Sequence, residues 1–302
     1  MSGIRLRLPA TSANLGPGFD TLALALRIYL EIEAERASVF TIAASGRNAE
    51  ICGAVQDNLL IETYRSVLAA RGLAEIPLRI RMNNQIPLGM GCGSSAAVRL
   101  AAVTLASHFG DLGWDRQRIL EEACRLEGHP DNAAACWLGG FVASAQLEDS
   151  VKAISIRPPA EWRAVIVMPD RPLSTAASRA VLPASYIPQD VIANLQSVAL
   201  LTAAFASGQS DLLSAAMRDR LHQPWRAEVC PLLPKLLPLA GHRGISGVAL
   251  SGAGPAVLLL SASAEDATQA CDFLRSMVLD EGGHELVVAE LEAEPALVQI
   301  VE

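Results

Sequence analysis

The sequence predicts an α+β fold made of two domains. Its 302 residues suit two domains of about 100–200 residues each, and 51% of them are hydrophobic, enough for a core without disulfides or structural metals. Strand-like and helix-like segments follow one another without the regular alternation of a doubly wound parallel sheet. The composition changes at Arg157-Pro158-Pro159, so we expect an N-terminal domain over residues 1–157 and a C-terminal domain over 158–302.

The N-terminal half is expected to hold four strands and four helices. Short apolar or alternating segments bounded by turn residues predict strands at 4–9, 28–34, 39–44 and 78–82, with a turn-rich loop at 10–20. Polar capping residues predict helices that start at Asp57-Asn58 and at Asp115 and end near residues 70 and 126. A small-residue helix at 98–109 and a short one at 132–136 complete this half.

The C-terminal half shows the same mixture of elements. Apolar runs predict strands at 162–168, 248–251, 257–260 and 285–291. Helical periodicity predicts helices at 191–207, 212–221 and 265–279. No internal repeat is visible.

Composition and charge exclude several classes of protein. The chain has 24 basic and 32 acidic residues and no basic run, which argues against a nucleic-acid partner. No apolar run approaches the ~20 residues of a membrane span and no signal peptide is visible, so we expect a cytoplasmic protein without a membrane partner. The six cysteines form no metal or redox motif, which predicts buried reduced thiols. The only lysines, Lys152 and Lys235, follow no glycine-rich loop, which excludes a P-loop.

A glycine-rich loop just before a helix carries the strongest chemical signal. Gly89, Gly91 and Gly93 alternate with other residues and are followed by Ser94 and Ser95. Glycines let a backbone approach a ligand closely, and a helix N-terminus offers free N–H groups and a positive dipole end to an anion. The two serines can cap the helix or offer hydroxyls to a phosphate or a metal ion. The alternative is a flexible turn before an ordinary capped helix.

Three other loops place polar or conformationally special residues at the junctions of elements. They are residues 11–20 with Asn14 and Asp20, residues 128–132 with His129 and Asp131, and residues 251–255. The alternative for each loop is a purely structural role as a turn or a helix cap. For Glu121, eight residues before His129, the alternative is an ordinary solvated residue of a helix. Four such loops in one acidic chain favour a single phosphate and substrate site assembled from distant segments.

Three of these loops resemble the motifs of the GHMP kinases. Residues 87–97, PLGMGCGSSAA, are similar to the ATP loop of that family, and residues 251–255, SGAGP, are similar to its third motif. Residues 9–20, PATSANLGPGFD, resemble the first motif of the branch that phosphorylates homoserine. Two positions depart from the family pattern: Cys92 replaces a leucine, which would expose the loop to oxidation, and Ala253 replaces a serine.

The resemblance implies a two-domain α+β GHMP kinase fold. Its N-terminal half would be like domain 2 of ribosomal protein S5, its C-terminal half would be ferredoxin-like, and the site would lie in the cleft between them. It implies an enzyme that uses ATP and Mg²⁺ to phosphorylate the side-chain hydroxyl of L-homoserine, giving O-phospho-L-homoserine, a step in threonine biosynthesis. It also implies a homodimer.

The resemblance assigns roles residue by residue. Asp20 would face the substrate ammonium, and Arg179 and Arg226 its carboxylate, with Gly254 nearby. The residues at the hydroxyl end would be Asn14, His129, Asn132 and Thr175. Glu121 and Ser94 would hold the magnesium ion, and Asn58 would lie on the adenine side. The ATP loop would comprise Pro87, Leu88, Gly89, Met90, Gly91, Cys92, Gly93, Ser94, Ser95, Ala96 and Ala97.

The substrate chemistry agrees with these residue types. A zwitterionic amino acid needs a carboxylate for its ammonium group and a bidentate guanidinium for its carboxylate, which lysine does not provide. No general base is evident, so we expect the hydroxyl to be activated by positioning. A GHMP kinase for another small alcohol, or a non-catalytic nucleotide- or amino-acid-binding protein on the same fold, remain as alternatives.

Overall fold

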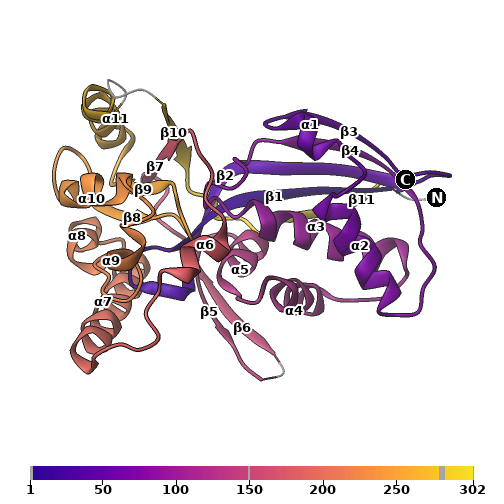
Figure 1. Cartoon of the computed structure of the whole chain (residues 1–302), viewed down its shortest axis with the longest axis horizontal. Coiled ribbons are helices and arrows are strands. Elements are labelled where there is room, and N and C mark those ends of the chain that lie inside the picture. Colours follow the sequence, from indigo (N-terminus) through magenta and orange to yellow (C-terminus); the bar gives the residue numbers. More distant parts are fainter. Residues whose placement is uncertain (1–2, 149, 279–282, 302) are drawn as a thin grey trace.

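Two β-sheets, each covered by helices, form the molecule (Figure 1). The computed structural model describes residues 3–148, 150–278 and 283–301. One sheet has seven strands and the other has four. Both ends of the described chain lie at the far end of the seven-stranded sheet (Figure 1).

The seven-stranded sheet is built around two long antiparallel strands, β1 (Gly3–Asn14) and β2 (Gly18–Arg36). Its other strands are β3 (Thr41–Gly46), β4 (Leu78–Asn84), β5 (Phe141–Gln146), β6 (Val151–Ile156) and β11 (Leu297–Val301). The main path runs β11-β1-β2-β4-β3, and the β5–β6 hairpin joins the other end of β2. The pairing is antiparallel except between β3 and β4.

One face of this sheet carries its helices. They are α1 (Ala49–Cys52), α2 (Leu59–Ala69), α3 (Ser94–Phe109), α4 (Arg116–Glu127) and α5 (Asp131–Leu138). Along β1, Ile4, Leu6 and Leu8 are buried while Arg5 and Arg7 are exposed, which is the alternation of a sheet with one covered face. Helices α3 and α5 pack directly on β1 and β2.

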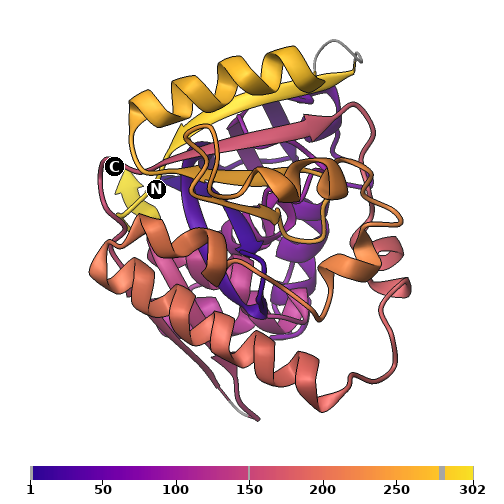
Figure 2. The ribbon, with the colours of Figure 1, turned by 90° about the vertical axis from the view of Figure 1, so that its left-hand side faces the viewer.

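The four-stranded sheet is antiparallel throughout. Its order is β10 (His284–Glu290), β7 (Arg163–Pro169), β9 (Val257–Ser261) and β8 (Gly247–Leu250). The helices of this half are α6 (Thr175–Ala180), α7 (Pro188–Ser207), α8 (Leu213–Ala216), α9 (Gln223–Arg226), α10 (Leu232–Leu236) and α11 (Ala264–Val278). Figure 2 shows α11 along one side of this half and α7 along the other.

Most predicted elements are confirmed, with shifted ends. The caps at Asn58 and Asp115 are present, because each side chain accepts hydrogen bonds from backbone N–H groups of the first helical turn. Of the loop expected at 10–20, residues 10–14 are instead the end of β1 and residues 18–20 are the start of β2. The predicted helix 212–221 is wrong beyond Ala216, because the Asp219 carboxylate accepts three backbone N–H groups and starts a new turn. The predicted helix end at Leu279 lies outside the described residues.

The domain boundary predicted after residue 157 lies between β6, a strand of the seven-stranded sheet, and β7, a strand of the four-stranded sheet. Strands β5, β6 and β11 were not expected from the sequence. β11 pairs with β1, so the last described residues return to the N-terminal sheet.

Among the described residues, one helix is long and apolar enough to cross a membrane by length and composition alone. It is α7, with 22% of its most apolar window buried. The expectation from uninterrupted apolar runs missed it because Asn194 and Gln196 interrupt the run. Its Phe205 stacks on Phe141, with ring centroids 4.1 Å apart. One such helix is weak evidence for a membrane span, because core helices of other proteins meet the same criterion.

Candidate active site

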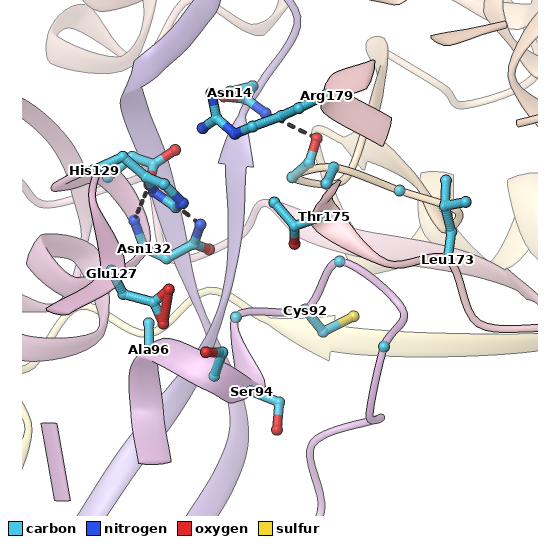
Figure 3. A pocket seen from close by; sticks show the side chains of 18 of the residues that line it. Asn14, Cys92, Ser94, Ala96, Glu127, His129, Asn132, Leu173, Thr175 and Arg179 are labelled. Carbon is cyan, nitrogen blue, oxygen red and sulfur yellow. Dashed lines mark hydrogen bonds and ion pairs between the residues drawn. The ribbon is translucent and has the colours of Figure 1, made fainter. Parts of the chain in front are cut away.

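A pocket lies where the glycine-rich loop meets segments from both halves of the chain (Figure 3). Its lining includes most of the residues singled out in the sequence: Asn14, Asp20, Pro87, Gly89, Gly91, Cys92, Gly93, Ser94, Ser95, Ala96, His129, Asn132, Thr175, Arg179, Arg226 and Gly254. Glu127, Asp131, Leu173, Gly252 and Ala253 complete it. Four loops that are far apart in the sequence therefore meet at one pocket.

The glycine loop is held by close contact with the first and third motifs. Gly91 and Gly93 have φ values of 77° and 71°, which side-chain-bearing residues rarely adopt. A Cβ at Gly91 would overlap the carbonyl oxygen of Ser251, and one at Gly93 would overlap the hydroxyl of Thr11. The Ser251 hydroxyl donates to the Gly91 carbonyl at 2.8 Å. Only glycine fits at these two positions, where three motifs touch.

The N-terminus of α3 opens into the pocket. Gly93 is the N-cap and provides no side-chain cap, so the possibility that a serine caps this helix is wrong: Ser94 and Ser95 are its first two residues. Within the described part of the chain, the N–H groups of Ser94, Ser95 and Ala96 donate to no backbone carbonyl. These free donors and the helix dipole make an anion site of the kind that holds phosphate.

The opposite end of the pocket is built from charged side chains. Arg179 donates two hydrogen bonds to the carboxylate of Asp20, at 2.6 and 3.0 Å. Asn14 fixes the Asp20 segment, since its side-chain oxygen accepts from the Asp20 N–H at 3.0 Å and its Nδ2 donates to the Gly252 carbonyl at 2.8 Å. Asp20 pairing also raises the pKa of Arg179, so that guanidinium is fully charged.

Arg226 is a buried charge with an incomplete set of partners. Its side chain is 1% exposed, and none of the ion pairs among the described residues includes it. Its Nη1 lies 3.1 Å from His222 Nδ1 and 3.3 Å from the Gly252 carbonyl. Burial and then the neighbouring Arg179 lower the pKa of Arg226. A buried guanidinium without a carboxylate partner favours an anionic ligand in the pocket that it lines.

A third group of polar residues follows α4. His129 Nδ1 lies 2.6 Å from Asp131 Oδ1, and this hydrogen bond raises the pKa of His129. Asp131 also accepts from the Asn132 N–H at 2.6 Å, and the Asn132 side-chain oxygen accepts from the Thr11 hydroxyl at 2.7 Å. Figure 3 shows His129 and Asn132 together on one wall, across the pocket from Thr175.

Glu121, assigned to the magnesium ion, and Asn58, assigned to the adenine side, are not among the residues that line the pocket. The Glu121 carboxylate accepts from Gln117 at 2.9 Å and lies 3.7 Å from Arg118. Asn58 caps α2, and its Nδ2 donates to the Cys52 and Ala54 carbonyls, so its amide is fully used within its own loop. Leu88, Met90 and Ala97 of the loop are also not among the lining residues.

Glu127, which sequence reasoning did not select, is the carboxylate that lines the pocket near the helix N-terminus. It is the last residue of α4, its side chain is 8% exposed, and Figure 3 shows it on the same side as Asn132 and Ala96. Its Oε1 lies 2.8 Å from Arg99 Nη1 but has no aligned hydrogen-bond donor among the described residues. A buried carboxylate that lines the pocket and is paired with Arg99 is an oxygen ligand of the type that Mg²⁺ takes, so Glu127 fits a metal-binding role.

The comparisons with known proteins agree with this geometry. The family model of the GHMP kinases N terminal domain matches residues 58–140, and the model of the GHMP kinases C terminal matches residues 201–278. A homoserine kinase of Solibacter usitatus is 46% identical over 85% of this chain and 85% of its own length. A homoserine kinase of Moorella thermoacetica is 40% identical over 84% of this chain and 86% of its own. The chain belongs to the homoserine kinase branch of the GHMP kinases.

The solved structures confirm the expected fold of this GHMP kinase. The crystal structure of homoserine kinase from Cytophaga hutchinsonii superposes with a TM-score of 0.82 at 24% identity, covering 98% of this chain and 97% of that one. The two-domain α+β GHMP kinase fold is therefore present, and the enzyme is a phosphotransferase of a family that uses ATP.

The signal that could have found Glu127 in this GHMP kinase was its position. It directly precedes the loop 128–132, which already stood out, whereas Glu121 was assigned to the metal ion from the family resemblance. Glycine at 128 has a φ of 84° and ends α4, which leaves the last side chain of the helix beside the pocket. Leu173 lines the pocket without a sequence signal.

Proposed function

We propose that this chain transfers the γ-phosphoryl group of ATP to the side-chain hydroxyl of L-homoserine, giving O-phospho-L-homoserine, a step towards threonine. The observation that supports it most is the division of one pocket into two ends. One end offers backbone N–H groups at the α3 N-terminus to phosphate, and the other combines one carboxylate with two guanidinium groups. That second set matches an amino-acid zwitterion.

The amino-acid end binds by exchanging partners. Asp20 turns to the substrate ammonium, and Arg179 joins Arg226 on the substrate carboxylate. One internal ion pair, Asp20–Arg179, is then replaced by pairs with both charges of the substrate. A ligand without a carboxylate would leave the buried Arg226 unpaired, which is costly, and a ligand without an ammonium group would lose a charge-assisted bond to Asp20, so the pocket selects zwitterions.

At the phosphate end, the residues present fit a magnesium ion. Glu127 and Ser94 would hold it, together with oxygens of ATP, in place of the Glu121 and Ser94 pair expected from the sequence. When bound, the ion neutralises negative charge that develops on the phosphates. The chain itself contributes the N–H groups of residues 94–96 and the α3 dipole, which stabilise the same charge without a P-loop lysine.

The hydroxyl end orients the acceptor. Thr175, Asn132 and His129 face the region between the two charged ends (Figure 3). Asp131 keeps the pKa of His129 above its ordinary value, which favours the protonated imidazole. His129 is therefore better suited to donate a hydrogen bond than to act as a base. Positioning of the hydroxyl against the phosphate, with proton loss to phosphate or solvent, accounts for the transfer without a dedicated base.

The test is ADP release with ATP, Mg²⁺ and each of L-homoserine, L-threonine, L-serine and mevalonate. We expect strong turnover with L-homoserine alone. Turnover with mevalonate and not with L-homoserine would keep the family and remove the amino-acid substrate. Binding of ATP without turnover on any alcohol would instead favour a non-catalytic binding protein on this fold.

A further inference from the structure

His222 is a buried histidine that contacts the pocket residue Arg226 but is not among the residues that line the pocket. It precedes α9 and is 0% exposed. Its Nε2 lies 2.7 Å from the carbonyl oxygen of Gly16, in the loop that leads to Asp20. Its Nδ1 lies 3.1 Å from Nη1 of Arg226. One imidazole therefore connects the first motif of the chain with an arginine 210 residues later.

The partners determine where the proton of this imidazole sits. A carbonyl oxygen only accepts, so the nitrogen facing Gly16 must carry hydrogen, and a guanidinium only donates, so the nitrogen facing Arg226 must be bare. His222 is thus the neutral tautomer with hydrogen on Nε2. Burial lowers the pKa of His222, although the Asp219 carboxylate, 3.6 Å from Nε2, and Asp20 act in the opposite direction.

The ring of His222 is also held by stacking. It lies against the ring of Phe19, with centroids 5.1 Å apart and planes 24° apart. The guanidinium carbons of Arg226 and Arg179 lie 5.1 and 5.4 Å from the centroid of the same Phe19 ring. Two like charges therefore lie near one aromatic ring, whose faces attract cations but do not fix their orientation.

The remaining donors of Arg226 show why its orientation depends on His222. Its Nε reaches the Ser178 carbonyl only at 3.4 Å, and its Nη1 reaches the Gly252 carbonyl only at 3.3 Å. The contact with His222 Nδ1 is the shortest of the three. Because Nε and Nη1 of Arg226 already donate hydrogen bonds within the protein, Nη2 is the nitrogen that can donate to a ligand carboxylate.

We propose that His222 is a positioning residue for the substrate carboxylate: as a neutral acceptor it fixes the rotation of the Arg226 guanidinium so that Nη2 faces the pocket. This rests on the proposed function, since it presumes that Arg226 binds the carboxylate of an amino-acid acceptor. His222 touches no reacting atom, so its effect belongs to amino-acid binding and not to phosphoryl transfer. The donor bond to Gly16 has a separate, structural effect on the first loop.

Two substitutions separate these effects. In His222→Asn the amide oxygen reaches the place of Nδ1 and keeps an acceptor for Arg226, whereas in His222→Gln the amide nitrogen reaches the place of Nε2 and keeps only the donor to Gly16. We expect His222→Gln to raise KM for L-homoserine about tenfold, the value of one hydrogen bond to a charged group, with kcat and KM for ATP nearly unchanged. His222→Asn should raise it less than about threefold. The exposed His242→Gln is the matched control.

Equal effects of the two variants on KM for L-homoserine, a larger effect of the asparagine, or a parallel rise in KM for ATP would each overturn the proposal. Turnover of the parent on L-homoserine reports the proposed function by itself, so the two failures are distinct. If a variant does not fold, ¹⁵N NMR of the parent, labelled at its five histidines, still decides. A bare Nδ1 and a protonated Nε2 at a buried histidine at neutral pH are expected, and a protonated Nδ1 would refute the role.

Discussion

The two ends of the pocket are made in different ways. Apart from Glu127, the phosphate end comes from one continuous stretch, residues 89–96, and offers mainly backbone groups held in shape by glycines. The amino-acid end comes from Asp20, Arg179 and Arg226, which belong to three distant segments and act through their side chains. The first end is local in sequence and depends on backbone shape, whereas the second is assembled by the fold and depends on charge.

This difference predicts different responses to mutation. Changes at the amino-acid end should alter substrate binding and leave the backbone intact, because a side chain can be replaced without moving its neighbours. Changes at the phosphate end should disturb the chain itself, because three motifs touch there with no room for a Cβ. Four substitutions test or sharpen this contrast.

Arg226→Met should produce the largest effect. Losing the buried guanidinium removes charge-assisted hydrogen bonds to the substrate carboxylate and should raise KM for L-homoserine at least about a hundredfold. The melting temperature should not fall, because methionine fills similar space without burying an unpaired charge. Steady-state kinetics and thermal unfolding measure both, with the exposed Arg218→Met as control. A lower melting temperature with unchanged KM would place Arg226 in the core and not in the site.

Gly91→Ala should show the opposite pattern. Alanine must hold a φ of 77° and its Cβ would overlap the Ser251 carbonyl, so we expect a loss of about 2 kcal/mol in the free energy of unfolding and weaker ATP binding. Gly72→Ala is the matched control, since Gly72 has a φ of 68° and no atom lies within 4 Å of the place that its Cβ would take. Urea unfolding of both variants separates the contact from the dihedral angle. Equal losses of unfolding free energy in the two variants would mean that the contact of Gly91 with Ser251 adds nothing to the cost of the dihedral angle.

Glu127→Gln should weaken metal use more than protein stability. A carboxylate ligand contributes more than an outer partner, whose loss typically costs 10–100-fold in metal affinity, so the Mg²⁺ concentration for half-maximal rate should rise at least about tenfold. Glu121→Gln is the control, because that carboxylate contacts Gln117 and Arg118 instead. The two titrations decide which glutamate serves the metal. A shift in the Glu121 variant alone would restore the metal role that the family resemblance assigned to Glu121.

These two glutamates also show what could be predicted from sequence. The caps at Asn58 and Asp115 and the glycine loop are local signals, and they were predictable because neighbouring residues determine them. The choice between Glu121 and Glu127 depends on which side of α4 faces the pocket, and six residues place them about 120° apart around the axis. Strand β11 was unpredictable because its partner, β1, lies at the other end of the chain.

His129→Gln should give the smallest effect, a pH-dependent change in the free energy of unfolding. It tests the part of the pocket between the phosphate end and the amino-acid end. Asp131 raises the pKa of His129 in the folded state, so the protonated histidine stabilises the fold. That contribution is complete below the ordinary pKa of about 6.5 and is lost as the pH rises through the raised value. The stability advantage of the parent over His129→Gln should therefore be about 1 kcal/mol or less near pH 5.5, and it should shrink toward pH 9. Urea unfolding at both pH values measures it. A parent advantage that grows with pH would show that His129 is held neutral, and would make it a candidate general base.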